Sequence, residues 1–373
     1  MSGIYIHIPF CKQACHYCNF HFSTSLKYKA ELVNAIVREI EMTTGYLSSA
    51  PLSGIYFGGG TPSLLNIEEL TYIFQILRKK YKWAGNAEIT LEANPDDIDL
   101  SKLKHWKALG INRLSIGIQS FFNEDLHWMN RAHSADEAEA SIKLAQDAGL
   151  INITVDLIYG SPTTSDAMWA QNIDKALGYN IDHISSYCLT VEKGTALAHF
   201  VAKGKYPDID QQKAANQFDM LIDTLCTNGY EHYEISNFAR NKRYSVHNSS
   251  YWKGDPYLGV GPGAHSYNGL SRRWNVSNNM KYIKAIEKGI LPFEEEVLSS
   301  IDRYNEYVIT RLRTKWGIDH HAVPEGLSDH FSEKIAWAKN EGYVYESENT
   351  IILTRKGKHF ADMVSMELMY EKR

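Results

Sequence analysis

Residues 107–116, KALGINRLSI, contain the pattern that decides the fold, because a helical segment ends on a glycine and an apolar strand follows within a few residues. The same order recurs in QDAGLINITVDL (146–157) and KALGYNIDHISS (175–186). Glycine adopts the left-handed backbone that closes a helix at little cost. Three glycines are therefore expected to end helices: Gly110, Gly149 and Gly178.

Short β-rich runs alternate with amphipathic helical segments over the first 190 residues. The expected strands are residues 3–8, 54–57, 88–93, 113–118, 152–160 and 183–190. The expected helices are residues 26–42, 101–109, 134–148 and 166–177, with a further helix opened by a capping box at Asn66 and Glu69. Strands joined by single helices pair in parallel with right-handed crossovers. An open doubly wound sheet and a barrel both satisfy this pattern.

The alternation fades after residue 190. A helix is expected over about residues 210–228, followed by one more strand and an irregular, aromatic-rich stretch. Helices return from about residue 280, and a strand-like segment precedes a terminal helix. We therefore expect two domains, residues 1–235 and 236–373.

The composition is that of a water-soluble globular protein, with 44% hydrophobic and 22% charged residues in a chain of 373. A net charge of -5, with Lys and Arg dispersed among acidic residues, argues against nucleic acid as a partner. No segment approaches the roughly 20 apolar residues of a membrane helix, and no basic leader precedes the first strand. The sequence predicts a cytoplasmic protein.

Three of the five cysteines fall within CKQACHYC, residues 11–18. Clustered thiols in a reducing compartment bind metal or catalyse more often than they form disulfides. Tetrahedral zinc needs four ligands, and His16 or His21 could supply the fourth. A cubane iron-sulfur cluster usually takes four cysteines, so three would leave one iron open to a substrate or cofactor. A cluster, zinc and unliganded thiols are the alternatives at this point, whereas Cys188 and Cys226 are expected to be small buried hydrophobes.

Two further features suggest a binding site. FGGGTPS (57–63) follows an expected strand directly, and its glycines suit either close approach to a ligand or a tight turn. Glu92, Gln119 and Asp156 fall at or near the C-terminal ends of the third, fourth and fifth expected strands. Ligands bind at that rim in a parallel barrel, although each residue alone would also suit a solvated strand end.

CKQACHYC fits the C-x3-C-x-aromatic-C signature, so the chain resembles the radical S-adenosylmethionine (SAM) superfamily. The preceding YIHIPFC narrows the resemblance to the oxygen-independent coproporphyrinogen III oxidase-like group. The resemblance covers nearly the whole chain. It implies an α/β fold, with a partial six-stranded (β/α) barrel followed by a smaller mixed α/β domain with a winged-helix-like end.

The same resemblance implies a [4Fe-4S] cluster whose open iron is chelated by SAM. The implied cluster ligands are Cys11, Cys15 and Cys18. The positions that match SAM contacts are Tyr5, Gly59, Gly60, Thr61, Glu92, Gln119, Arg131 and Asp156, and Tyr17 matches the aromatic residue of the cysteine loop.

Several positions favour the heme-chaperone branch of this group over the oxidases. Phe20 stands where the oxidases carry a fourth cysteine, and fewer residues precede the first cysteine. HNSSYW (247–252) matches the HNxxYW motif of the chaperone branch. His247 is a candidate heme ligand because neutral imidazole binds iron well, Tyr251 and Trp252 could stack on a porphyrin, and His265 is a weaker candidate. Alternatively, this stretch seals a contact between the domains.

We therefore expect a heme chaperone that binds a [4Fe-4S] cluster, SAM and heme and passes heme to client heme proteins such as respiratory enzymes. The alternative is an oxygen-independent coproporphyrinogen III oxidase, which cleaves SAM and decarboxylates porphyrinogen propionates. A zinc-stabilised binding module is a third hypothesis. The sequence is also compatible with a homodimer and with peripheral membrane contact through the C-terminal segment.

Overall fold

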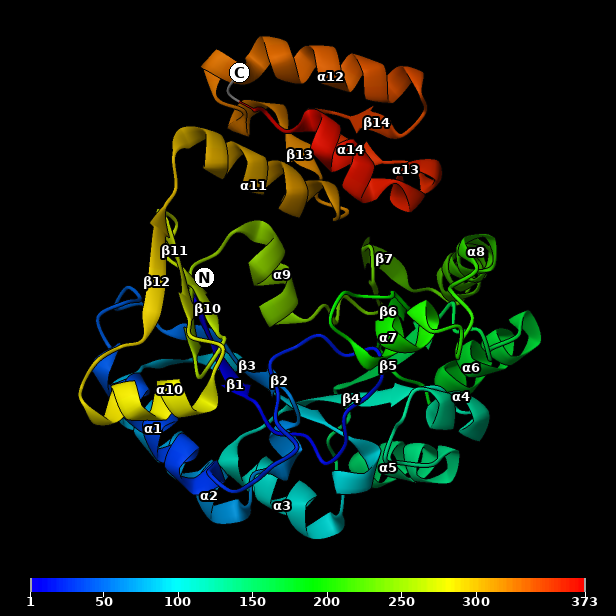
Figure 1. The fold of residues 1–373 in the computed structure, drawn as a ribbon. Helices are drawn as coiled ribbons and strands as arrows, with labels where there is room; N and C mark the ends of the chain where they lie inside the picture. Colours follow the sequence, from blue (N-terminus) through cyan, green and yellow to red (C-terminus); the bar gives the residue numbers. More distant parts are fainter. Residues whose placement is uncertain (1, 372–373) are drawn as a thin grey trace.

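Six parallel strands follow one another in chain order at the centre of the fold in this computed structural model, which describes residues 2–371 (Figure 1). They are β1 (Gly3–Ile8), β2 (Leu52–Gly59), β3 (Trp83–Ala93), β4 (Arg113–Gln119), β5 (Ile153–Tyr159) and β6 (His183–Cys188). Each pairs in parallel with the next. The expected α/β architecture with a central parallel sheet is confirmed.

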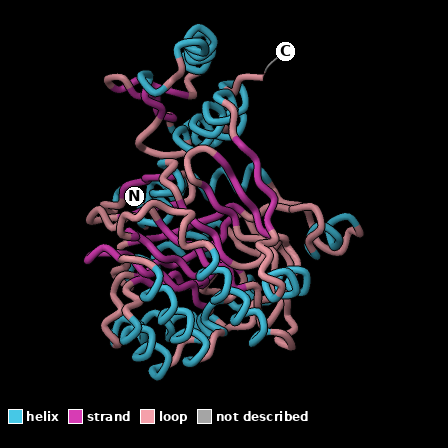
Figure 2. The backbone as a smooth tube through the Cα atoms, turned by 90° about the vertical axis from the view of Figure 1, so that its left-hand side faces the viewer, coloured by secondary structure: helices cyan, strands magenta, loops and turns pink. Residues whose placement is uncertain are grey.

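Helices connect these strands and cover the outside of the curved sheet, as Figure 2 also shows. They are α1 (Lys29–Met42), α2 (Ile67–Lys80), α3 (Leu100–Leu109), α4 (Asn123–Trp128), α5 (Ala135–Asp147) and α6 (Asp166–Gly178), and short 3-10 turns lie at Pro62–Leu64 and Pro95–Asp97. Capping boxes at Asn66 and Ser134 open α2 and α5. Their apolar faces join the strands in one large core.

Two of the three expected glycine caps are confirmed. Gly110 and Gly149 have left-handed backbones, with φ of 98° and 77°. Gly178 is instead the last residue of α6, and Asn180 takes the left-handed position with φ of 57°. Asn tolerates this conformation better than most residues because its short amide bonds locally, so the prediction for Gly178 was wrong by two positions.

The sheet continues beyond the six parallel strands on both sides, in the order β12-β11-β10-β9-β1 and β6-β8-β7. These strands are β7 (Glu231–Glu234), β8 (Asn237–Ala239), β9 (Tyr257–Val260), β10 (His265–Tyr267), β11 (Ser271–Asn275) and β12 (Phe293–Val297). Residue 235, the expected boundary, falls instead between β7 and β8, which pair with each other. Four helices accompany this part: α7 (Ala196–Ala202), α8 (Gln211–Thr227), α9 (Val246–Lys253) and α10 (Asn279–Glu287).

A smaller unit with its own hydrophobic core, whose first member is Tyr304, follows β12. It contains α11 (Ser300–Leu312), α12 (Ser328–Asn340), α13 (Arg355–His359) and α14 (Ala361–Leu368), with 3-10 turns at His320–Ala322 and Glu325–Leu327. These pack on a sheet of β13 (Ile318–Asp319), β15 (Thr350–Leu353) and β14 (Val344–Ser347). Within residues 2–371, no helix is both long and apolar enough to cross a bilayer.

Helix α9 lies between the parallel strands and this C-terminal unit (Figure 1). The backbone N–H of Val246 donates to Glu88 Oε1 at 2.8 Å, near the middle of β3, and the Val246 side chain packs beside Gly54 of β2. The α9 segment therefore covers the N-terminal ends of the strands, whereas the cysteine loop follows the C-terminal end of β1.

Candidate functional site

The inside of the curved sheet contains a cavity of about 680 Å³. Among the sequence-predicted site residues, its walls include Tyr5, Cys11, Cys15, Tyr17, Cys18, Gly59, Gly60, Thr61, Glu92, Gln119, Arg131, Asp156 and His247. Inward positions on parallel strands recur every second residue, which explains why residues so far apart in the chain meet here. His265 is not among the wall residues.

The clustered cysteines lie on the loop after β1 and are each half-buried. The Thr61 hydroxyl donates to Cys11 Sγ at 3.5 Å, and Arg131 Nη1 donates to Cys15 Sγ at 3.4 Å. Burial raises the pKa of Cys11 to about 11, so the free thiol stays protonated near neutral pH. A bound metal centre and the Arg131 cation would both favour the thiolate.

Arg131, which sequence alone left hard to place, is fixed beside the cysteine loop. Its Nη2 donates to Asn94 Oδ1 at 2.6 Å and to the Gly117 carbonyl at 2.9 Å. The guanidinium thereby links the turn after β3 and strand β4 to Cys15 and puts a positive charge against the sulfur.

The two histidines that could complete a zinc site have other partners. His16 Nδ1 lies 2.8 Å from the Trp128 carbonyl, and its ring packs edge-on against Phe200. His21 Nε2 lies 2.7 Å from Asn279 Oδ1. Within the described residues, no three His, Cys, Asp or Glu side chains converge on one ion position. Tetrahedral zinc would need a fourth ligand, and both candidate histidines are engaged elsewhere. A cubane binds its cysteines on separate irons, so three thiols without a fourth ligand fit a cluster better.

The glycine turn after β2 is packed too tightly for side chains. A Cβ on Gly60 would lie 2.7 Å from the Phe10 carbonyl oxygen, and one on Gly59 would lie 2.5 Å from His7 Nδ1. Gly59 also has a φ of 107°. The turn therefore lies directly against the residues that lead into the cysteine loop, with Thr61 reaching Cys11.

Two carboxylates face the middle of the cavity. The Tyr56 hydroxyl donates to Glu92 Oε1 at 2.7 Å, and the Ser115 hydroxyl donates to Asp156 Oδ2 at 3.1 Å. Burial raises the pKa of Glu92 to about 7 and that of Asp156 to about 6. A cationic ligand between them would recover the cost of ionising both groups.

Gln119 ends β4 in the left-handed region, with φ of 65°. A residue other than glycine pays roughly 1–3 kcal/mol for such a backbone, and such residues cluster at functional sites. The strand register also shifts between Ile116 and Gln119. This irregularity lies on the cavity wall beside the glycine at position 117.

His247 lies on α9 and lines the cavity at the end opposite the cysteine loop. Its ring stacks on Tyr56, with centroids 4.5 Å apart, and lies 5.8 Å from the Tyr5 ring. Burial lowers the pKa of His247 to about 4, so its imidazole is neutral at physiological pH. Within the described residues no hydrogen bond engages either ring nitrogen, so both stay available to a ligand.

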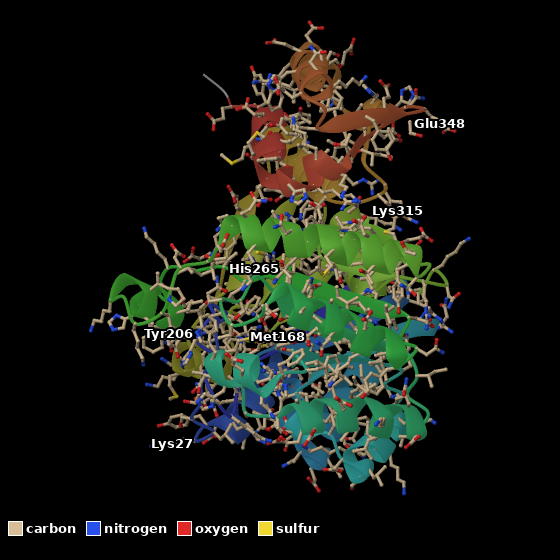
Figure 3. All side chains as sticks on the ribbon, turned by 90° about the vertical axis from the view of Figure 1, so that its right-hand side faces the viewer. Lys27, Met168, Tyr206, His265, Lys315 and Glu348 are labelled. Carbon is tan, nitrogen blue, oxygen red and sulfur yellow. The ribbon has the colours of Figure 1, made fainter. Side chains whose placement is uncertain are left out.

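The other aromatic residues of HNSSYW do not join this wall. Trp252 lies under the Arg313 guanidinium, 5.3 Å from the ring centroid, in contact with the C-terminal unit. Tyr251 packs against Tyr257. The alternative of a domain contact therefore describes Trp252, whereas Tyr251 packs against β9 of the large sheet, and neither residue lines the cavity. The exposed His265, labelled in Figure 3, packs against Trp274 on β11 outside the cavity.

Sequence comparisons agree with this geometry. Residues 5–176 match the radical SAM superfamily, and residues 298–360 match the HemN C-terminal domain. Over 365 residues the chain is 32% identical to the heme chaperone HemW of Bacillus subtilis, covering 96% of both chains. The chain belongs to the HemW family of the radical SAM superfamily. Membership of the superfamily implies a [4Fe-4S] cluster and SAM.

Two further relatives of this HemW-family chain are informative. It is 36% identical over 336 residues to the mitochondrial radical S-adenosyl methionine domain-containing protein 1 of Bos taurus, covering 86% of this chain and 74% of the relative. Coproporphyrinogen III oxidase (HemN) of Escherichia coli superposes with a TM-score of 0.85 at 24% identity, covering 99% of this chain and 90% of the oxidase. That likeness establishes a shared fold.

Sequence analysis missed several wall residues of the HemW-family cavity. They are Tyr56, Arg113, Ser115, His183, Ser185 and Tyr187. The signal was present, because Arg113 and Ser115 on β4 and His183, Ser185 and Tyr187 on β6 occupy alternate positions of predicted strands. Polar residues at every second position of a buried strand indicate a polar interior.

Proposed function

We propose that this HemW-family chain is a heme chaperone, which binds a [4Fe-4S] cluster, SAM and heme and transfers heme to client proteins. One observation carries the proposal: the three clustered thiols and the unbonded imidazole of His247 open into the same cavity from opposite ends. A single ligand space thus joins the cluster loop to a candidate heme ligand.

At the cysteine end, Cys11, Cys15 and Cys18 hold the cluster in this proposal. A cluster held there would supply an open iron site for SAM and one-electron chemistry. The Arg131 guanidinium stabilises the negative charge of the Cys15 thiolate, because its Nη1 lies 3.4 Å from Sγ. Glu92 and Asp156 hold the cationic groups of SAM, and the glycine turn at residues 58–60 offers backbone groups that no side chain covers.

At the α9 end, His247 binds heme iron in this proposal. Its neutral imidazole has no competing hydrogen bond, and the stacked Tyr56 and Tyr5 rings hold its orientation. Neutral imidazole is a common axial ligand of heme iron.

A hemin titration tests the heme site. His247→Ala should bind hemin about tenfold more weakly or worse and should change the Soret absorption. His265→Ala removes an exposed histidine outside the cavity and should leave both readings unchanged. Unchanged hemin affinity and spectrum in a folded His247→Ala protein would end this assignment.

A second experiment separates chaperone from oxidase. Anaerobically reconstituted protein, given reductant, SAM and coproporphyrinogen III, should release no protoporphyrinogen IX, whereas hemin-loaded protein should donate heme to an apo heme protein. Release of 5'-deoxyadenosine together with protoporphyrinogen IX would replace the proposal with the oxidase. Anaerobic iron and sulfide analysis, with Cys15→Ser as the control, tests the cluster itself.

The clients in this proposal are heme proteins such as respiratory enzymes, reached from the cytoplasm. Dimer formation and contact with a membrane surface stay predictions. Size-exclusion chromatography with light scattering, and flotation with lipid vesicles, test these two predictions directly.

A further inference from the structure

The cavity walls contain several side chains able to bind iron, but most already have hydrogen-bond partners. His183 uses both ring nitrogens, since Nδ1 lies 3.0 Å from Thr154 Oγ1 and Nε2 lies 2.8 Å from the Tyr233 hydroxyl. The Tyr56 hydroxyl bonds Glu92 at 2.7 Å, and the Tyr5 hydroxyl lies 3.1 Å from His7 Nδ1. Binding iron through any of these groups would leave a buried partner without its hydrogen bond.

The sulfur and oxygen groups nearer the cysteine loop are also engaged. Cys188 Sγ lies 3.5 Å from the Leu189 carbonyl, and Tyr17 belongs to the cysteine loop itself, next to Cys15. Outside the cysteine loop, the described wall residues therefore offer one phenol oxygen and one imidazole without a hydrogen-bond partner. These belong to Tyr187 and His247.

Tyr187 occupies an inward position on β6, two residues after Ser185, and 48% of its surface is exposed. Its hydroxyl is close enough to Asp156 and Glu92 for their charges to act on it. His247 instead stacks against tyrosines of β1 and β2. Because β1 and β2 stand at one end of the six-strand row and β6 at the other, curvature of the sheet places the two groups on facing walls.

We infer that Tyr187 is a second heme ligand, whose phenol oxygen binds the iron on the face opposite His247. The inference rests on the proposed heme-binding function and adds a residue to it. Tyrosine is an established ligand of ferric heme. On binding, the oxygen–iron bond forms and the phenol proton leaves to solvent, so no electron is transferred.

The surroundings keep Tyr187 neutral in the absence of iron. Tyr187 is partly exposed because it lines the open cavity, but the surrounding protein desolvates its hydroxyl, and this desolvation, followed by the charges of Asp156 and Glu234, raises the pKa of Tyr187. The phenol oxygen of Tyr187 bonds no described residue, so binding iron through it breaks no existing hydrogen bond. The higher charge of ferric iron favours loss of the phenol proton more than ferrous iron does, so heme should bind as ferric hemin in preference to the ferrous form.

Tyr187→Phe removes the oxygen and keeps the ring, which separates ligation from stacking. We expect hemin affinity to fall about tenfold or more and the phenolate-to-iron charge-transfer absorption to disappear. Tyr72→Phe is the matched control, because Tyr72 is an exposed tyrosine on α2. Wild-type affinity and spectrum in Tyr187→Phe, with weakened binding in His247→Ala, would overturn the role of Tyr187 while leaving the proposed function standing.

Tyr187→His tests the geometry directly. If position 187 faces iron opposite His247, this variant should give the low-spin ferric spectrum of two axial imidazoles, and Tyr187→His combined with His247→Ala should not. A high-spin spectrum in the folded single variant would overturn the inference. Absence of hemin binding by the wild-type protein would instead reject the proposed function.

Discussion

Gly60 is the residue at which the turn after β2 lies closest to the backbone that leads into the cysteine loop. Added atoms would meet the Phe10 and Ile8 carbonyl oxygens at 2.7 and 2.8 Å, and backbone atoms cannot move aside cheaply. Gly60→Ala should therefore lower the free energy of unfolding by about 1–3 kcal/mol and reduce the iron retained per chain after anaerobic reconstitution. Gly45→Ala, whose Cβ would meet nothing within 4 Å, is the control. Equal stability and iron content in both variants would contradict this reading of the turn.

Glu92 gives the ligand-free protein a pH dependence of known sign. Its folded pKa of about 7 lies above the ordinary value of 4.5, mainly through burial. The folded protein therefore favours the protonated carboxyl, so the free energy of unfolding is highest at low pH and falls as pH rises from 4.5 through 7. The isosteric Glu92→Gln should raise the free energy of unfolding at pH 8 by on the order of 1 kcal/mol and change it little at pH 5. Urea unfolding at both pH values, with the exposed Glu287→Gln as control, measures this. A destabilised Glu92→Gln protein at pH 8 would show that the carboxylate is favourably paired.

At the scale of elements, α9 depends on a chain of buried hydrogen bonds. Arg113 bonds Thr154, Thr154 lies 3.0 Å from His183, and His183 lies 2.8 Å from the Tyr233 hydroxyl. Asn248 of α9 donates to the same hydroxyl at 3.2 Å. The helix that carries His247 is therefore tied to the interior of β4, β5 and β6.

Tyr233→Phe should loosen α9 without creating a cavity. Tyr233 is fully buried. Without its hydroxyl, His183 and Asn248 lose a hydrogen-bond partner, which should lower the free energy of unfolding by about 1–3 kcal/mol. Hydrogen exchange of the α9 amides should accelerate more than that of α2. Tyr72→Phe, on the exposed face of α2, serves again as the control. Unchanged exchange in α9 would show that the Tyr233 hydroxyl does not hold the helix in place.

At the scale of the whole molecule, the C-terminal unit is attached mainly through charged and aromatic groups. The two large hydrophobic clusters share only the half-buried Ile235 among the described residues. Arg355 of α13 contacts Asp219 and Asp223 of α8 at 2.7 and 2.5 Å, and Lys253 lies 4.4 Å from the Trp316 ring centroid. Lys315, labelled in Figure 3, lies at this junction and pairs with Glu231.

An attachment of this kind should respond to salt. Exposed ion pairs contribute little to global stability, so Arg355→Ala should change the free energy of unfolding by less than about 1 kcal/mol. At low ionic strength, the α13 amides of Arg355→Ala should nevertheless exchange faster than those of the wild-type protein. High salt screens the ion pairs, so it should raise the wild-type exchange rate to that of the variant. Lys334→Ala breaks a pair with Glu367 inside the C-terminal unit and is the matched control. Salt-independent exchange of α13 in the wild-type protein would contradict the prediction.

The sequence by itself determined the parallel order of six strands, the helices between them and the identity of the clustered thiols. These follow from local regularities, since apolar period, capping residues and cysteine spacing are all read within one segment. Asn66 and Gly110 behave as their local signals predict. The family resemblance, confirmed over nearly the full chain, added the positions that are expected to contact SAM, which spacing does not reveal.

Only the tertiary structure decided which residues face one another across the cavity. The aromatic pair Tyr251 and Trp252 turned out to pack outside it, whereas Tyr187 faces inward. The sheet also carried on past residue 235, because β7 to β12 pair at its two edges. Curvature of a sheet and the docking of a helix at its end depend on contacts between segments far apart in the chain, and no local pattern of residues encodes the resulting distances.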